Sequence, residues 1–595
     1  MSFDYILEIN YGGQDTDIPT QVAEAPFSQQ GQPQVTVKKP DSCPLLEEPV
    51  PLLVAIECID PAICSGNSFE VGGPNSVTIT PSNGGSNLNY VLVDASFDGT
   101  ETALSDLIFN DVGRIKLHVD AGGALDAKEF VVKPSYLALS DSISTTHTAG
   151  VDFTMSVAAF GANGGLLPNY QSDRLGFSFA RVLPESVATN GALLNIDFAS
   201  NQGAPLALSD GGTIDSFNEF DSGVAQPQFS GGSSESFTAR LNEVGQFAVD
   251  VQDADYLGVG VINSNRFGAN PANMVIGRFI PAYFTAELEH RFQGYCGEDS
   301  DFAYRGSAIA TSAEGHTLTL TAYNALNSTT QYYDADVSNY FYYNTAKDFN
   351  GRTYIGGGGN NITGAPAANL MASFSNDNAG DGRFSFVLAG DTITVEKSAL
   401  PDIPWMTEAG SDQINLRIDA AELLDNDGVG VKTEYADAGY LDVISGPVID
   451  GMEIRDGRIA MENIFGSNLN ELTVILQTQY FNSDSEWVLN ESDSCTLYDG
   501  GYIESLDGDY QINAYGSGTF VEGQSQQGGD GAVFIELDVE EDDSGEFDVQ
   551  YTIPDHQDFL RFDWDGDGEL GSPTAKIIFG INRGNDRIIH WREVY

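Results

Sequence analysis

One strand-like pattern recurs four times along the chain, and it limits the possible fold more than any other feature of the sequence. In each copy a glycine is followed by a polar residue, then by Ile or Phe, and then by nearly strict alternation of apolar and polar residues. The copies are VGRIKLHVDA (112–121), VGQFAVDV (244–251), DGRFSFVL (381–388) and SGEFDVQY (544–551). Such alternation with period two is typical of a β-strand that has one buried face.

The first copy shows which side chains should be buried. We expect a core-facing set and a solvent-facing set, which are Ile115, Leu117 and Val119 on one side and Arg114, Lys116 and His118 on the other. The glycines of the four copies, Gly113, Gly245, Gly382 and Gly545, lie 132, 137 and 163 residues apart. A similar strand at such intervals predicts tandem β-sandwich domains.

A second pair of segments supports the repetition. Residues 150–170 and 315–333 each contain an alternating strand, an Ala–aromatic step and a Tyr eleven residues after that Ala. Together with 65 glycines and 11% aromatic residues, these patterns predict an all-β fold of tandem, Ig-like β-sandwich domains with short helical insertions. The best helix candidate is 416–424, LRIDAAELL.

These patterns divide the chain into five segments. Residues 1–68 are expected to hold a leftover strand and a Pro/Gln-rich linker whose composition cannot build a core. A small Ig-like sandwich is expected over 69–133. Larger β domains follow over 134–276, 277–445 and 446–595.

Five cysteines favour an oxidising compartment. Cys58 and Cys64 flank a short loop that a disulfide could close, and Cys296 and Cys495 could meet although they are far apart in sequence. The second bridge would tie the segment 277–445 to the segment 446–595. Cys43 then stands alone, and no spacing among the five suits a zinc site.

The chain carries 26 basic and 87 acidic residues, a net charge of −61. This charge argues against nucleic acid and anionic membranes as partners. No apolar run is long enough to span a bilayer, so we expect no membrane insertion within this chain. The start, MSFDYILEIN, lacks the basic head and apolar core of a signal peptide, so a secreted protein is expected here as a mature chain or a fragment.

The segment FDWDGDGE (562–569) is a candidate calcium loop. Asp563, Asp565 and Asp567 alternate as the first ligands of an EF-hand loop do, and Gly568 occupies its sixth position. The twelfth position holds Thr574 in place of the expected bidentate Glu. The alternatives are a calcium site of another architecture and an acidic turn between strands.

The segment YYDADVSNYFYYN (332–344) is rich in aromatic residues, and exposed rings such as Tyr340, Tyr342 and Tyr343 could stack on sugars. Alternating aromatics in a strand are more often core residues. The sequence contains no nucleophile elbow, zinc-protease, P-loop or dinucleotide-binding motif, so we expect no enzyme.

The last residues carry a family resemblance. The run FLRFDWDGDGELGSPTAKIIFGINRGNDRIIHWREVY (559–595) resembles the C-terminal signature of the MSHA (mannose-sensitive haemagglutinin) pilus biogenesis proteins of the MshQ and DUF6701 family. The matching elements are Asp563-Trp564, Phe579-Gly580, and Arg583 through Glu593. Residues 276–284, 320–333 and 456–496 also resemble this family, in its order.

The resemblance implies a non-enzymatic surface protein outside the cell, associated with a type IV pilus and its pilins. We therefore expect a structural, adhesive or assembly role. Two other functions stay open: a carbohydrate-binding or carbohydrate-active protein that contacts surface glycans, and a surface adhesin whose domains stiffen on calcium.

Overall fold

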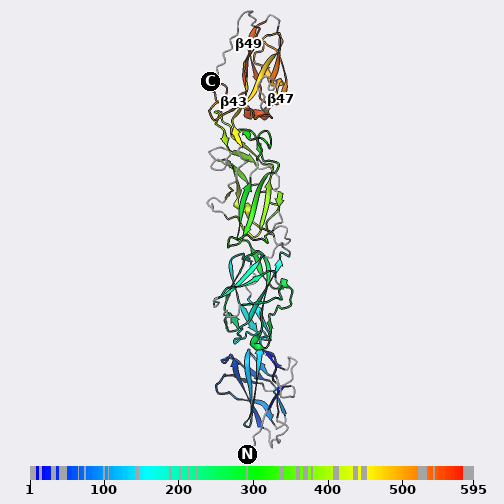
Figure 1. Cartoon of the computed structure of the whole chain (residues 1–595), viewed down its shortest axis with the longest axis vertical. Helices are drawn as coiled ribbons and strands as arrows, with labels where there is room; N and C mark the ends of the chain where they lie inside the picture. The colour runs from blue at the N-terminus through cyan, green and yellow to red at the C-terminus, as the bar shows by residue number, and fades with distance from the viewer. Residues whose placement is uncertain are drawn as a thin grey trace, which may run out of the picture. The chain divides into compact units, whose positions relative to one another are not determined.

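The structure is a computed structural model, and its regular elements are almost entirely β-strands (Figure 1). It describes residues 8–11, 17–27, 35–38, 50–64, 66–72, 76–97, 101–104, 106–140, 146–185, 191–199, 203–211, 213–220, 226–289, 292–333, 341–356, 362–365, 373–376, 380–406, 414–432, 440–443, 452–519, 532–539 and 543–580. The helices in these ranges are short 3-10 turns: η3 (Tyr256–Gly258), η4 (Pro271–Asn273), η5 (Ala420–Leu423), η6 (Gly500–Tyr502) and η7 (Asp555–Leu560). Within the same ranges, no helix is long and apolar enough to cross a membrane.

The chain forms two compact units. Unit 1 comprises Met1–Tyr283, Ala322–Phe341 and Asn378–Arg383, and unit 2 comprises Phe284–Thr321, Tyr342–Asp377 and Phe384–Tyr595. The strands group into four successive β-sandwiches, which we call the first to the fourth sandwich. The predicted all-β, tandem-sandwich fold is therefore confirmed.

The first sandwich is built around the antiparallel strands β4, β11 and β12. Its strands are β1 (Glu8–Tyr11), β2 (Gln21–Val22), β3 (Val35–Lys38), β4 (Val50–Asp60), β5 (Phe69–Val71), β6 (Val77–Ile79), β7 (Ser82–Asn83), β8 (Val91–Phe97), β9 (Glu101–Leu104), β10 (Ile108–Phe109), β11 (Gly113–Ala121) and β12 (Ala124–Lys133). The predicted core residues of β11, Ile115, Leu117 and Val119, are at most 1% exposed.

The boundary expected at residue 68 is wrong. Strand β4 pairs with β11 along eight positions, and β1 and β3 form a sheet with β9. The strands before residue 68 are therefore part of the first sandwich and not a remnant. The sequence did not show this, because β4 pairs with a strand more than fifty residues further along the chain.

The second sandwich has a long central strand, β24, that carries the second copy of the repeated pattern. The strands are β13 (Tyr136–Leu139), β14 (Thr146–Thr148), β15 (Asp152–Met155), β16 (Val157–Phe160), β17 (Leu175–Leu183), β18 (Leu193–Phe198), β19 (Leu206–Ser209), β20 (Asn218–Glu219), β21 (Phe229–Ser230), β22 (Ser233–Ser234), β23 (Phe237–Leu241), β24 (Gly245–Asp253), β25 (Ile262–Asn263) and β26 (Val275–Ile280). β24 lies between β17 and β26 in the sheet, and it is buried on both faces over Phe247–Asp250.

The third sandwich includes β34, the third copy of the pattern. The strands are β27 (Tyr283–Glu289), β28 (Phe302–Tyr304), β29 (Ile309–Ala310), β30 (His316–Tyr323), β31 (Thr353–Gly356), β32 (Ile362–Ala365), β33 (Ser373–Ser375), β34 (Arg383–Leu388), β35 (Thr392–Val395), β36 (Trp405–Met406), β37 (Ile414–Asp419), β38 (Tyr440–Val443) and β39 (Glu453–Arg455). The helix predicted over 416–424 is wrong for most of its length: β37 runs to Asp419 and only the single turn η5 follows.

The fourth sandwich carries the last copy, β49, and is the part labelled β43, β47 and β49 in Figure 1. The strands are β40 (Gly457–Met461), β41 (Ile464–Gly466), β42 (Leu472–Phe481), β43 (Trp487–Leu489), β44 (Leu497–Asp499), β45 (Ile503–Ser505), β46 (Ile512–Tyr515), β47 (Ser517–Thr519), β48 (Ala532–Leu537), β49 (Gly545–Tyr551) and β50 (Thr574–Phe579). Its core is apolar and fully enclosed, with Val474, Val533, Val549 and Ile577 each 0% exposed.

One parallel pairing occurs in every sandwich. A short early strand runs parallel to the last strand, in the pairs β2–β12, β14–β26, β28–β39 and β41–β50. The first sandwich has a further parallel pairing, between β4 and β7. The pairing of an early strand with the last strand recurs in all four sandwiches, so it is a repeated structural landmark of the chain.

Candidate functional site

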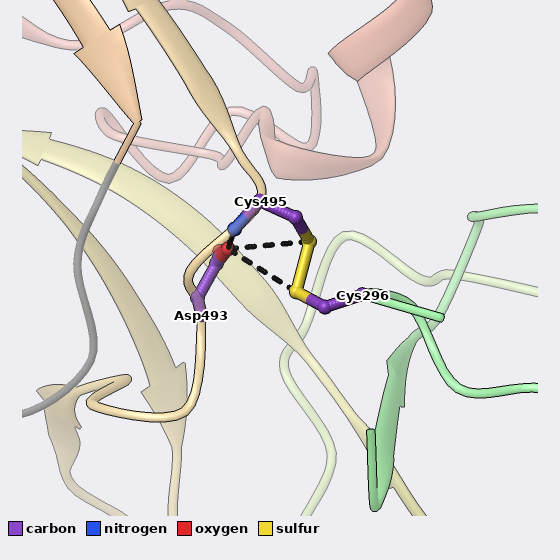
Figure 2. Close-up of side chains that lie close together, drawn as sticks. All are labelled: Cys296, Asp493 and Cys495. Atoms are coloured by element: carbon purple, nitrogen blue, oxygen red, sulfur yellow. Dashed lines mark hydrogen bonds between the residues drawn. A yellow bond between two sulfur atoms is a disulfide. The ribbon is translucent and has the colours of Figure 1, made fainter. Parts of the chain in front are cut away.

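A disulfide joins the third sandwich to the fourth within unit 2. Cys296 lies between β27 and β28, and Cys495 precedes β44; their Cα atoms are 5.4 Å apart. Figure 2 shows Asp493 beside the bond: its Oδ1 is 3.9 Å from the Sγ of Cys296 and 3.8 Å from that of Cys495. The sulfur atoms of a disulfide carry no proton, so these are close contacts between a carboxyl oxygen and the bridge.

Asp493 is 1% exposed and is the centre of a buried polar network. Its Oδ2 accepts hydrogen bonds from the hydroxyls of Tyr304 (2.8 Å) and Thr496 (2.6 Å), and its Oδ1 accepts from the backbone N–H of Thr496 (2.9 Å). Burial and the neighbouring Asp493 raise the pKa of Tyr304 well above its ordinary value, so this phenol stays protonated and keeps donating. The network therefore links β28 of the third sandwich to the loop before β44.

A lysine completes this connection. The Nζ of Lys397, which follows β35, donates to the backbone carbonyl oxygens of Gly457 and Phe559 in the fourth sandwich, both at 2.6 Å. Burial lowers the pKa of Lys397 to about 8. The third and fourth sandwiches thus share one covalent bond and two sets of buried hydrogen bonds.

The other cysteines are placed as follows. Cys58, near the end of β4, and Cys64 form a second disulfide that closes the predicted short loop, with Cα atoms 6.3 Å apart. Cys43 lies outside the described residues. The oxidation state of these cysteines in the isolated protein stays a prediction.

The aspartates of the predicted calcium loop come together. Asp563, Asp565 and Asp567 each offer a carboxylate oxygen, and these oxygens lie within 4.8 Å of one another. The carboxylate of Asp563 already accepts hydrogen bonds from the backbone N–H groups of Gly566 (2.7 Å), Asp567 (3.1 Å) and Gly568 (3.0 Å). Three oxygen ligands would suit a calcium ion, but the twelfth position, Thr574, begins β50 and offers no bidentate carboxylate.

Next to this loop, an arginine is enclosed by aromatic rings. The guanidinium carbon of Arg458 in β40 lies 4.1 Å from the ring centre of Trp487, 4.8 Å from that of Trp564 and 5.0 Å from that of Phe562. The side-chain oxygen of Gln479 accepts from both Nε and Nη2 of this arginine. Burial lowers the pKa of Arg458 to about 10. Trp564 therefore has a structural role that the sequence did not reveal.

The predicted aromatic platform, 332–344, is described by the structure only at 332–333 and 341–344. Tyr343 is 3% exposed and packs against Phe284, Phe384 and Phe386, so its assignment as a ligand-stacking residue is wrong. Tyr342 is half-buried, and Tyr340 lies outside the described residues. The apolar surroundings of Tyr343 favour packing over sugar binding for this ring.

The fold and these connections define a class of protein, namely a chain of tandem Ig-like β-sandwiches with disulfide bonds. Three family models match it: "Domain of unknown function (DUF6701), first Ig-like domain" over residues 5–135, "DUF6701, third domain" over 243–442, and "DUF6701, fourth domain" over 455–594. The chain therefore contains DUF6701 domains over most of its length. No curated protein matches it.

Solved structures resemble the chain only in general architecture. Invasin, a bacterial integrin-binding protein, is 10% identical, with 92% of this chain and 76% of that chain covered and a TM-score of 0.27. The Escherichia coli adhesin FdeC is 13% identical, with 76% and 98% covered and a TM-score of 0.23. Surface layer protein SbsC, domains 4–9, is 11% identical, with 97% and 66% covered and a TM-score of 0.18. Scores this low carry no argument about function.

Proposed function

We propose that the chain is a non-enzymatic, secreted protein of the cell surface, where its sandwiches serve a structural or adhesive role in association with a type IV pilus of the MSHA kind. The observation that carries this proposal is the Cys296–Cys495 disulfide with Asp493 and Tyr304 beside it. A covalent bond between successive sandwiches is useful where a protein bears mechanical stress, and such bonds persist in oxidising compartments.

The pilus association rests on the family resemblance of residues 559–595 and of the matched DUF6701 domains. The partners proposed from it are pilins. The test is shear fractionation of the source cells, with this chain and the major pilin probed in the same fractions. Co-sedimentation of the chain with sheared filaments supports the association. Retention in the envelope while the filaments shear away removes it and leaves an assembly or separate surface role.

A calcium-stiffened adhesin is the second candidate function, because the carboxylates of Asp563, Asp565 and Asp567 lie close together. The carbohydrate-binding alternative is weakened, since Tyr343, one of its three predicted stacking residues, belongs to the core. A glycan array with the full chain tests that alternative directly, and binding that survives a Tyr342→Ala substitution would place any glycan site elsewhere.

A further inference from the structure

Three places in the chain share one backbone arrangement, and we call them joints 1, 2 and 3. At each joint, the residue after the short parallel strand donates its N–H to the carbonyl of the last residue of the last strand. These hydrogen bonds are Ala23 to Lys133 (2.9 Å), Ala149 to Ile280 (2.9 Å) and Arg305 to Arg455 (2.8 Å). Joints 1 and 2 belong to unit 1, and joint 3 belongs to unit 2.

The next residue at each joint repeats a second hydrogen bond. Glu24, Gly150 and Gly306 have φ values of 64°, 82° and 82°. Their N–H groups donate to the carbonyl oxygens of Phe109 (2.8 Å), Leu241 (2.6 Å) and Val395 (2.7 Å), respectively. Two independent hydrogen bonds and the same left-handed backbone step make these three places structurally equivalent.

The equivalence of the three joints identifies one further position that they share, although its residue type differs from joint to joint. Two residues beyond each of those carbonyls stand Asp111, Glu243 and Lys397. Asp111 is 0% exposed, Glu243 is 3% exposed, and Lys397 is partly buried. Removing an ionisable group from water in this way costs folding free energy unless its polar atoms are hydrogen-bonded.

At joint 1, Asp111 binds backbone of the second sandwich. Its Oδ1 and Oδ2 lie 3.2 Å and 3.3 Å from the backbone nitrogen of Asn169, which donates to this carboxyl group. The N–H of Ala162 from the same sandwich also donates to the carbonyl of Ala23, at 2.9 Å. Joint 1 therefore attaches the turn 161–170 to the end of the first sandwich.

At joint 2, Glu243 does the same with the turn 324–332, which belongs to unit 1. Its Oε1 accepts from the N–H of Tyr332 (3.1 Å), and its Oε2 accepts from that of Gln331 (2.9 Å). The N–H of Ala325 donates to the carbonyl of Ala149, at 2.9 Å, as Ala162 does at joint 1. The hydroxyl of Tyr332 donates to Asp210, at 2.6 Å.

At joint 3, the equivalent position holds a hydrogen-bond donor in place of an acceptor, and it also binds backbone groups of a later segment. Lys397 is a donor, and it binds the carbonyl oxygens of Gly457 and Phe559 where the two acids bind N–H groups. An added Cβ at Gly306 would lie 3.0 Å from the Cβ of Phe559, so this segment of the fourth sandwich packs closely against the joint. In all three joints the side chain holds backbone atoms of the following segment.

We propose that Asp111, Glu243 and Lys397 are the coupling residues of the chain: at the equivalent position of each joint, a single buried or partly buried polar side chain fixes a segment that follows in the sequence by binding its backbone. Because the bonds to the following segment go only to its backbone groups, that segment can vary in sequence as long as its N–H or C=O groups point at the coupling residue. This inference does not depend on a pilus association.

The test uses the full chain and hydrogen exchange read by mass spectrometry, at one fixed pH. Glu243→Met removes the acceptor oxygens and keeps most of the volume, whereas Glu243→Gln keeps one acceptor oxygen. A buried N–H group that loses its acceptor costs about 1–3 kcal/mol, so we expect protection in 324–333 to fall roughly tenfold to hundredfold in the Met variant and less in the Gln variant. Protection in β18 and β23 should stay unchanged.

Glu219→Gln is the matched control, since this glutamate of the second sandwich is only partly buried and pairs with Arg174 at 2.9 Å. It should leave the exchange of 324–333 as it is. The proposal is overturned if Glu243→Met leaves 324–333 fully protected. It is equally overturned if β18 and β23 lose protection to the same extent, because Glu243 would then be an ordinary core residue.

Discussion

Removal of the Cys296–Cys495 bridge should destabilise the fourth sandwich selectively. When this sandwich unfolds alone, the third stays folded, and the bridge closes an unfolded loop that runs from about Gly457 to Cys495. In the chain-entropy model, a loop of about 40 residues corresponds to a stabilisation of about 4 kcal/mol at 25 °C. For a domain of this size, that loss lowers the melting temperature by about 10–15 °C.

The assay is differential scanning calorimetry of the full chain with Cys296→Ser and Cys495→Ser combined, so that neither partner of the bridge is left as a lone thiol. The Cys58→Ser and Cys64→Ser pair is the control, because its bridge spans a sequence separation of 6. The same model gives that short loop only about 2 kcal/mol, and the effect should fall on the first sandwich. An unchanged transition of the fourth sandwich after loss of the long bridge would refute the reasoning.

Three further predictions follow from the sites. Burial raises the pKa of Glu243 to about 8, and the neighbouring charge of Asp210 adds to this rise, so the contribution of Glu243 to stability should be lost as pH rises from about 4.5 to 8. The melting temperature of unit 1 should therefore fall over this range, and Glu243→Gln should flatten the dependence. For calcium, a site of about 10⁻⁴–10⁻³ M affinity predicts about 1.4–2.7 kcal/mol of stabilisation at 10 mM, seen as a higher melting temperature that Asp565→Asn abolishes; no rise contradicts the site. Arg458→Lys should cost the fourth sandwich about 1–2 kcal/mol in urea unfolding and shift the tryptophan emission, and an unchanged midpoint would mean that the enclosing rings add nothing.

The repeated strands could be predicted because their signal is local. The alternation of apolar and polar residues along β11 predicts which side chains are buried, and the structure confirms this at Ile115, Leu117 and Val119. The glycines that open β11 and β24 are also explained: Gly113 and Gly245 have φ values of 137° and 135°, and an added Cβ would clash with the carbonyl oxygens of Asp60 and Leu183.

The coupling residues could not be predicted in the same way. Asp111, Glu243 and Lys397 share no residue type, and their equivalence depends on hydrogen bonds between segments far apart in sequence. One signal was present, since an acid stands two residues before Gly113 and before Gly245. In a chain with 87 acidic residues, that signal has little weight until the backbone shows what the acids bind.

The most direct test of the central claim is the oxidation state of Cys296 and Cys495 in the source cells. Free thiols are blocked during lysis, and the chain is then digested and mapped by mass spectrometry without reduction. We expect a peptide pair joined through Cys296 and Cys495, as for a surface protein whose third and fourth sandwiches are covalently tied. Recovery of both cysteines as blocked free thiols would contradict the bridge, the oxidising location and the structural role built on them.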